Sequence, residues 1–372
     1  MDIYKELGIT SVINASGRMT KLGVSCISDE VKQAMDAAAS HYVVMDELME
    51  AAGRKLAQYI GCEDVCVTSS ASSGIALAIA SLICGNNLQS VQQFHKTVLR
   101  TDKREVVLLK GHNVDFGAPI DLMIHTGGGI AVETGYANAS CLEDIRHAVN
   151  AQTLAILYVK SHHCVQKNMV DAAQVIALAK QLRLPCIIDA AAEEELSRYI
   201  RLGADFVCYS GAKAISGPTS GFVACRKKAD ASAMRLQYRG IGRVMKVGKE
   251  HIAGLVKAVE LYTENGGYRP VISREELQSF CDHVAEIPGL KAALIHDEAG
   301  RDITRCRIQV LDEYGCSAAA LASYMKTCET PVYTRDYRVL EGFLDIDPRP
   351  LNNSMELQTI WQVLHTGKGN VL

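Results

Sequence analysis

The chain lacks a strong net charge and a long apolar run, and each absence excludes a class of protein. Its 372 residues carry 39 Lys and Arg against 42 Asp and Glu, a formal charge of −3, whereas a nucleic-acid-binding protein normally needs a basic face. The longest apolar stretch, residues 75–84, is interrupted by Ser81 and is far shorter than the ~20 residues that span a membrane. Because 48% of the residues are hydrophobic, the composition also argues against a disordered chain.

The 13 cysteines do not follow the pattern of a disulfide scaffold or a metal site. Disulfide-rich secreted domains are short and dense in cysteine, and this chain is neither. Cys62 and Cys66 have the wrong spacing for a Cys-x-x-Cys pair, so we expect no metal site. Several others lie in apolar runs, where cysteine acts as a small buried hydrophobic residue. The N-terminal segment has no basic start followed by an apolar run, and we expect a cytoplasmic protein with reduced thiols.

Short apolar runs alternate with helical segments between about Asp64 and Lys227. The predicted strands are residues 65–68, 106–109, 130–133, 154–159, 186–189, 206–209 and 221–225. The predicted helices are residues 74–83, 89–99, 142–149, 170–181 and 193–200. This alternation indicates an α/β domain with a mostly parallel sheet, and the nearly all-apolar strands are typical of a sheet that is covered on both faces.

The pattern changes after Lys227. A long helical stretch, residues 249–264, leads to a break at Gly266 and Gly267. The elements that follow predict a smaller α+β domain: helices at 275–286, 318–326 and 355–365, and strands near 290–295, 307–311 and 343–347. We therefore expect three parts, namely an N-terminal segment (1–50) that packs on the active site and a partner subunit, a large α/β domain (51–250) and a small C-terminal domain (251–372).

Polar residues follow several predicted strands, and ligands of open parallel sheets bind at the carboxyl ends of the strands. The small residues 69–74 follow the first strand and open a helix, where backbone N–H groups and the helix dipole favour an anion; an ordinary serine cap is the alternative. His112 follows the strand 106–109, and Asp189 ends the strand 186–189. Lys213 follows the strand 206–209.

A carboxylate, a lysine, an imidazole and an anion-binding turn at one sheet edge are what pyridoxal 5'-phosphate (PLP) requires. Its phosphate needs the turn, its aldehyde needs a lysine amine, and its pyridine nitrogen needs a carboxylate partner. Its ring needs a flat partner. Each residue alone also fits an ordinary role: Asp189 could cap a helix and Lys213 could be solvated. The inference therefore depends on the order of all four along successive strand ends.

Three segments of the sequence carry a resemblance to a known family: residues 12–17 (VINASG), residues 210–213 (SGAK) followed by 216–218 (SGP), and residues 344–351 (LDIDPRPL). Through them the chain resembles fold-type I PLP-dependent enzymes, within them the selenocysteine synthase-like group, and most closely D-glucosaminate-6-phosphate ammonia-lyase. The resemblance covers nearly the whole chain. It implies PLP as cofactor, a transferase-like large domain with a smaller C-terminal domain, and a homodimer or larger homo-oligomer.

The resemblance also implies roles for individual residues. Lys213 would bind the cofactor covalently, and Asp189 would pair with its ring nitrogen. The phosphate ligands would be Ser70, Ala71, Ser72 and Ser210. His112 is expected to stack on the ring, with a simple turn histidine as an equal alternative.

An amino-acid substrate also needs a partner for its carboxylate, and a guanidinium matches a carboxylate with two hydrogen bonds. Arg349 matches the family position best, Arg335 and Arg338 are nearby candidates, and Arg18 is a fourth. A surface ion pair is the alternative for each. A basic cluster formed by Arg243, Lys246 and Lys249 follows the large domain. It is either a solvated helix start or an anion site for a phosphorylated substrate, shared across a dimer interface.

These observations predict a PLP-dependent lyase that removes ammonia from a small 2-amino-3-hydroxy acid, with D-glucosaminate 6-phosphate as the substrate expected from the resemblance. Lys213 would serve as the general base on the α-proton. One alternative is a selenocysteine synthase-like transferase acting on aminoacyl-tRNA, which the charge of −3 disfavours. Another is a non-catalytic PLP-binding relative. We expect no nucleic-acid or membrane partner.

Overall fold

The computed structural model describes residues 3–115, 117–161, 163–165, 167–297 and 302–368. The chain divides into two compact units. Unit 1 combines residues 1–26 with residues 269–372, and unit 2 consists of residues 27–268. Among the described residues, no helix is both long and apolar enough to cross a membrane.

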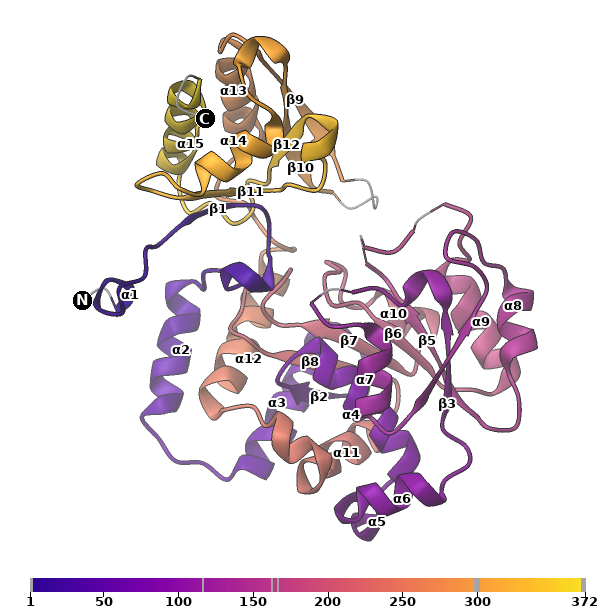
Figure 1. The fold of residues 1–372 in the computed structure, drawn as a ribbon. Coiled ribbons are helices and arrows are strands. Elements are labelled where there is room, and N and C mark those ends of the chain that lie inside the picture. Colours follow the sequence, from indigo (N-terminus) through magenta and orange to yellow (C-terminus); the bar gives the residue numbers. More distant parts are fainter. Residues whose placement is uncertain (1–2, 116, 162, 166, 298–301, 369–372) are drawn as a thin grey trace. The chain divides into compact units, whose positions relative to one another are not determined.

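Unit 2 is built on a seven-stranded sheet with the order β2-β8-β7-β6-β5-β3-β4. Its strands are β2 (Asp64–Thr68), β3 (Glu105–Leu109), β4 (Ile130–Thr134), β5 (Thr153–Val159), β6 (Cys186–Asp189), β7 (Phe206–Ser210) and β8 (Gly221–Cys225). Strands β4, β3, β5, β6 and β7 run parallel to one another, whereas β8 runs antiparallel to both β7 and β2. The prediction of a mostly parallel sheet is confirmed (Figure 1).

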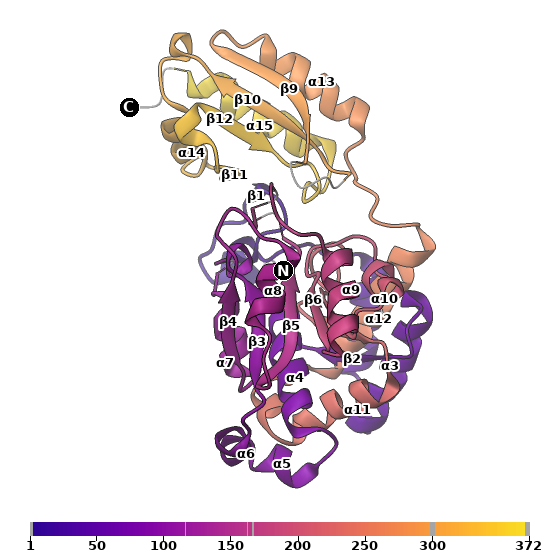
Figure 2. The ribbon, with the colours of Figure 1, turned by 90° about the vertical axis from the view of Figure 1, so that its right-hand side faces the viewer.

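Helices cover both faces of this sheet (Figure 2). They are α2 (Asp29–Ala39), α3 (Met45–Ile60), α4 (Ala71–Cys84), α5 (Leu88–Gln92), α6 (Phe94–Arg100), α7 (Ile120–Thr126), α8 (Leu142–Ala148), α9 (Ala172–Leu182), α10 (Arg198–Leu202), α11 (Lys228–Leu236) and α12 (Lys249–Glu264). Short 3-10 turns lie at η2 (Lys110–His112), η3 (Gln237–Arg239) and η4 (Ile241–Met245).

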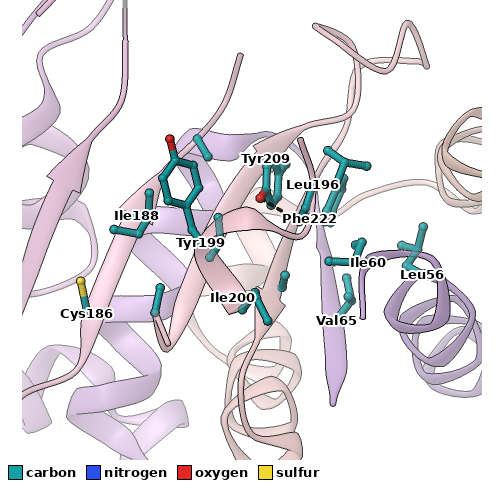
Figure 3. Packing of buried hydrophobic residues seen from close by; sticks show 14 of the residues in the cluster. Leu56, Ile60, Val65, Cys186, Ile188, Leu196, Tyr199, Ile200, Tyr209 and Phe222 are labelled. Atoms are coloured by element: carbon teal, nitrogen blue, oxygen red, sulfur yellow. Dashed lines mark hydrogen bonds between the residues drawn. The ribbon is translucent and has the colours of Figure 1, made fainter. Parts of the chain in front are cut away.

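Successive strand side chains enter two different cores, because they point to opposite faces of the sheet. In β2, Val65 and Val67 pack in one core with Leu56 of α3, and Cys66 packs in the other with Ile75 of α4. Figure 3 shows part of the first core, where side chains of β6, β7 and β8 meet side chains of α3 and α10: Ile188, Tyr209, Phe222, Leu56 and Tyr199. Burial on both faces explains why the strands are almost entirely apolar.

Unit 1 has its own core. A three-stranded antiparallel sheet has the order β12-β10-β9, and a two-stranded parallel sheet pairs β1 with β11. The strands are β1 (Ile13–Ala15), β9 (Leu290–His296), β10 (Thr304–Val310), β11 (Val332–Thr334) and β12 (Phe343–Ile346). The helices are α1 (Ile3–Glu6), α13 (Arg274–Ala285), α14 (Ala318–Met325) and α15 (Ser354–Gly367). The α+β character expected of the C-terminal part is present.

The boundaries of the parts differ from those expected from the sequence. Ile13 pairs with Val332, so the N-terminal strand belongs with the C-terminal unit rather than with a separate segment. Helix α12 packs on α2 and α3, and the division therefore falls after residue 268 instead of 250. Two predicted helices also change: residues 89–99 form two helices, and α10 begins only at Arg198.

All 13 cysteines are free thiols. Cys66, Cys186, Cys208 and Cys225 are at most 1% exposed within their strands, as predicted for core residues. Burial raises the pKa of the Cys66 thiol to about 12, which leaves it protonated and unreactive at neutral pH.

Candidate active site

Residues from several elements meet at one edge of the sheet in unit 2. Because β3, β5, β6 and β7 are parallel, their carboxyl ends lie at the same edge. That edge holds His112 after β3, Asp189 at the end of β6 and Ser210 at the end of β7. Strand β2 ends there as well, because β2 and β7 both run antiparallel to β8. The structure thus brings together the cofactor residues predicted from the sequence.

The turn after β2 is a helix cap, and the helix N-terminus that it opens favours an anion. The Ser73 N–H donates to Ser70 Oγ at 3.0 Å, and the Ser70 N–H donates to Ser73 Oγ at 2.9 Å, so the ordinary cap is present. Ala71 and Ser72 occupy the first turn of the 14-residue helix α4, whose N-terminus favours negative charge. A Cβ built on Gly221 would lie 2.3 Å from the Ser70 carbonyl carbon, so β8 holds the turn in place closely.

Asp189 and Lys213 form the charged pair of the site. Asp189 is 8% exposed, and its Oδ1 accepts the Ala191 N–H at 3.0 Å. Burial raises the pKa of Asp189, while the positive charge of Lys213 acts against that rise. A carboxylate that is buried at this cost is stabilised by a cationic N–H partner, which is what a protonated pyridine ring provides.

The loop that carries Lys213 is closed by backbone hydrogen bonds. The Gly211 N–H donates to the Ser220 carbonyl at 2.9 Å, and the Gly217 N–H donates to the Gly211 carbonyl at 2.8 Å. A Cβ on Gly217 would lie 2.9 Å from the Gly211 carbonyl oxygen, so the tight loop requires glycine there. Ser216 adopts a positive φ of 57° within it. This geometry explains the glycine at position 217.

His112 is a buried, neutral imidazole. It is 2% exposed, its Nδ1 accepts the Val159 N–H at 3.3 Å, and its ring lies edge-on to Tyr158 with 4.4 Å between centroids. Burial and the nearby charge of Lys160 lower the pKa of His112 to about 4. These contacts are those of a histidine that belongs to the turn after β3. Stacking of His112 on the cofactor stays a prediction.

Lys160 is a residue of this edge that the sequence analysis missed. It directly follows β5, is half-buried, and donates its backbone N–H to the Asp189 carbonyl at 2.9 Å. The rule used for the other strands, which examines the first residue after each strand, would have found it.

The four arginines considered for the carboxylate all lie in unit 1, in different surroundings. Arg349 donates from Nε and Nη2 to the two oxygens of Asp347, at 2.9 and 2.7 Å. Arg338 pairs with Glu341 three residues on, which is the surface ion pair given as its alternative. Arg335 is half-buried and lies over the Tyr337 ring, 4.5 Å from its centroid. Arg18, also half-buried, completes the set.

The basic cluster lies at the other edge of the unit 2 sheet. Arg243, Lys246 and Lys249 line a cavity of about 880 Å³. Arg235 lines it too and hydrogen-bonds to Asp64 at the start of β2, whereas the anion-binding turn follows the end of β2. Lys249 donates to the Ala38 and Ala39 carbonyls at the C-terminus of α2, a structural role. Within one chain, Arg243 and Lys213 are therefore not brought together.

The sequence matches a known family over most of its length. The family described as L-seryl-tRNA selenium transferase matches residues 12–286. The chain belongs to this family. It is 43% identical to D-glucosaminate-6-phosphate ammonia lyase of Salmonella typhimurium over 349 residues, which is 94% of this chain and 93% of that protein. It is also 38% identical to 5'-C-glycyluridine monooxygenase-decarboxylase of a Streptomyces species, over 94% of this chain and 88% of that protein.

Comparison with solved structures shows that this chain has a known fold. A structure of D-glucosaminate-6-phosphate ammonia-lyase superposes with a TM-score of 0.91 at 41% identity, covering 100% of this chain and 99% of that one. Aspartate aminotransferase of Thermotoga maritima, at 14% identity and a TM-score of 0.53 over 97% of this chain and 94% of that one, shares the fold. Fold type I is thus confirmed.

The cofactor of these relatives is PLP, and the residues of the sheet edge fit it. The N-terminus of α4 suits the phosphate, the buried carboxylate of Asp189 suits a protonated ring nitrogen, and Lys213 lies close enough to influence that carboxylate. Unit 2 thus contains a residue that fits each of these three parts of the cofactor.

Proposed function

We propose that this chain is a PLP-dependent ammonia-lyase that converts D-glucosaminate 6-phosphate to 2-keto-3-deoxygluconate 6-phosphate. The observation that carries the proposal is the buried carboxylate of Asp189, which feels the charge of Lys213, in a chain 43% identical to an ammonia lyase with that substrate name. The agreement extends over nearly the full length of both chains, so it includes both units.

The residues divide the work between them. When bound, PLP supplies an aldehyde that combines with the substrate amine and a ring that withdraws electrons from C2. Lys213 Nζ removes the proton from C2, and Asp189 accepts a hydrogen bond from the ring nitrogen and keeps it protonated. The 3-hydroxyl leaves with a proton, so water is lost from C2 and C3. The resulting enamine takes up a proton at C3, and addition of water at C2 then releases ammonia and leaves a keto group.

A homodimer or larger assembly is part of the proposal. Tyr42, Val43 and Val44 are 102%, 50% and 60% exposed, and Val244, next to Arg243, is 84% exposed. Exposed apolar side chains of this kind are often covered by a contact with another chain. In such an assembly Arg243 can serve the active site of a second copy, as the shared anion site requires.

The 13 free thiols support a reducing compartment such as the cytoplasm.

The proposal is tested with purified holoenzyme and a panel of D- and L-2-amino-3-hydroxy acids, with and without a terminal phosphate. We expect release of ammonia and keto acid in equal amounts, fastest with D-glucosaminate 6-phosphate. Cofactor absorbance without turnover of any acid would favour the non-catalytic alternative. Consumption of a seryl-tRNA instead would favour the activity named for the family.

A further inference from the structure

The loop of residues 190–197, which follows β6, is anchored to the core of unit 2 by buried tyrosines. Tyr209 of β7 is 1% exposed and donates its hydroxyl to the Leu196 carbonyl at 2.8 Å. Tyr262 of α12 is also buried and donates to the Glu194 carbonyl at 2.6 Å. A buried hydroxyl that lost its partner would cost free energy, so these bonds hold the loop in one conformation.

Glu193 is held within this loop by its side chain as well as by its backbone. Its N–H donates to the Ala190 carbonyl at 3.0 Å, and its Oε2 accepts the hydroxyl of Tyr199 at 3.0 Å. Tyr199 is 2% exposed and lies in the same core as Tyr209 (Figure 3). Glu193 itself is half-buried, so its carboxylate has a defined place instead of moving freely in solvent.

The same turn brings the charge of Glu193 close to Asp189, four positions earlier in the chain. The Ala191 N–H donates to Asp189 Oδ1 at 3.0 Å, so the start of the loop also orients the Asp189 carboxylate. Burial makes the largest contribution to the raised pKa of Asp189, the positive charge of Lys213 opposes it, and the negative charge of Glu193 adds to it. The two carboxylates repel each other, which favours a proton or a cation at Asp189.

Other groups that face the two carboxylates keep their charge near neutral pH. Cys164 and Cys208 lie within reach of the charge of Asp189, and burial raises the pKa of both thiols. Burial also raises the pKa of three tyrosines that face Glu193, namely Tyr158, Tyr199 and Tyr209. Arg198 lies over the Tyr199 ring, 5.7 Å from its centroid, and an arginine stays protonated throughout this range.

We propose that Glu193, held in place by Tyr199, acts through Asp189 to keep the ring nitrogen of PLP protonated. The inference deepens the proposed function and rests on its assignment of Asp189 to that nitrogen. A second negative charge near Asp189 raises the affinity of the carboxylate and the ring nitrogen for their shared proton. Glu193 is then a positioning residue, and its charge makes the ring a stronger electron acceptor.

The test measures protonation of the ring nitrogen directly, by NMR of holoenzyme loaded with PLP that carries nitrogen-15 in the ring, between about pH 6 and pH 10. Glu193→Gln removes the charge and keeps an amide oxygen that can accept the Tyr199 hydroxyl. Tyr199→Phe removes the hydroxyl and keeps the charge, and a double variant combines both changes. Glu195→Gln is the matched control, because Glu195 lies in the same loop but is exposed and pairs with Arg201. Thermal unfolding of each variant is recorded in parallel.

We expect the pH at which the ring nitrogen loses its proton to fall by about 0.5 pH unit or more in Glu193→Gln, and by less than about 0.2 pH unit in Glu195→Gln. Tyr199→Phe should cause a smaller fall than Glu193→Gln. The double variant should match Glu193→Gln, because Tyr199 acts through Glu193.

Equal nitrogen-15 shifts of wild type and Glu193→Gln at every pH, or additive effects in the double variant, would overturn the inference. A neutral ring nitrogen in the wild type at about pH 7 would overturn it as well. If Glu193→Gln did not load PLP, the absence of any fall in Tyr199→Phe would count against the inference by itself. A wild type that shows the expected differences but releases no ammonia would contradict the proposed function alone.

Discussion

At the scale of single residues, the site depends on charges that burial makes sensitive to their neighbours. Asp189 is buried with a raised pKa, and the charge of Lys213 acts in the opposite direction. His112 is buried next to Lys160, and both effects favour its neutral form. His112 therefore stays uncharged above about pH 5, whereas the proton-transfer roles belong, in our proposal, to Lys213 and Asp189.

The low pKa of His112 predicts a measurable dependence of stability on pH. Its pKa is about 4 in the folded chain and about 6.5 in the unfolded chain, so between these values only the unfolded chain binds the proton. Stability is therefore lost as the pH falls, by about 2 kcal/mol between pH 7 and pH 5 from this residue alone. We expect denaturant unfolding at the two pH values to show that extra loss in wild type and not in His112→Gln. The same difference between the two pH values in both proteins would contradict the assignment.

At the scale of elements, helix α4 has a structural cap at the place where we propose that the cofactor phosphate binds. Ser70 closes the capping box with Ser73, and Ser72 lies in the first turn with its side chain half-buried. Substitution of Ser70 should therefore affect mainly the helix cap, and substitution of Ser72 should affect mainly binding of the cofactor phosphate.

We expect Ser70→Ala to lower the free energy of unfolding by about 1 kcal/mol, the usual effect of losing an N-cap. Ser72→Ala should weaken cofactor binding with a change in unfolding free energy below about 0.5 kcal/mol. Chemical unfolding of the cofactor-free proteins and titration with PLP measure the two effects. If Ser72→Ala were to lower stability as much as Ser70→Ala while binding PLP normally, Ser72 would not be a phosphate ligand.

The elements that could be predicted from the sequence are those with a strong local pattern. All seven strands of unit 2 were predicted. Six of them are buried on both faces and form apolar runs, whereas the edge strand β4 is partly exposed. Helix α12 was predicted from residue 249 to 264. Pairing between distant segments has no local signal, so the addition of β1 to β11 was missed. The same limit applies to the site: Lys213 and Asp189 follow strands, whereas the pairing of Arg349 with Asp347 depends on side-chain placement in the folded chain.

At the scale of the whole molecule, the near-neutral net charge favours a small amino acid over an aminoacyl-tRNA as the substrate. The family that matches this chain is described as L-seryl-tRNA selenium transferase. With 39 basic against 42 acidic residues, this chain has little excess charge to attract a polyanion.

We therefore expect no shift of tRNA in a native gel at micromolar protein and about 0.1 M salt, with a basic tRNA-binding protein as positive control. The reason is that affinity for a phosphate backbone comes largely from displaced counterions, which a chain of charge −3 displaces poorly. Binding that weakens steeply as salt is raised would reverse the choice between the two functions.

The most direct test of the account measures ammonia and keto-acid release from D-glucosaminate 6-phosphate by wild type and Lys213→Ala. Arg201→Gln, at an exposed position paired with Glu195, serves as the control. The account predicts equal amounts of both products from the wild type and the control, and a rate for Lys213→Ala at least ~100-fold lower, the low end for loss of a positioned general base. A near-normal rate in Lys213→Ala would contradict it.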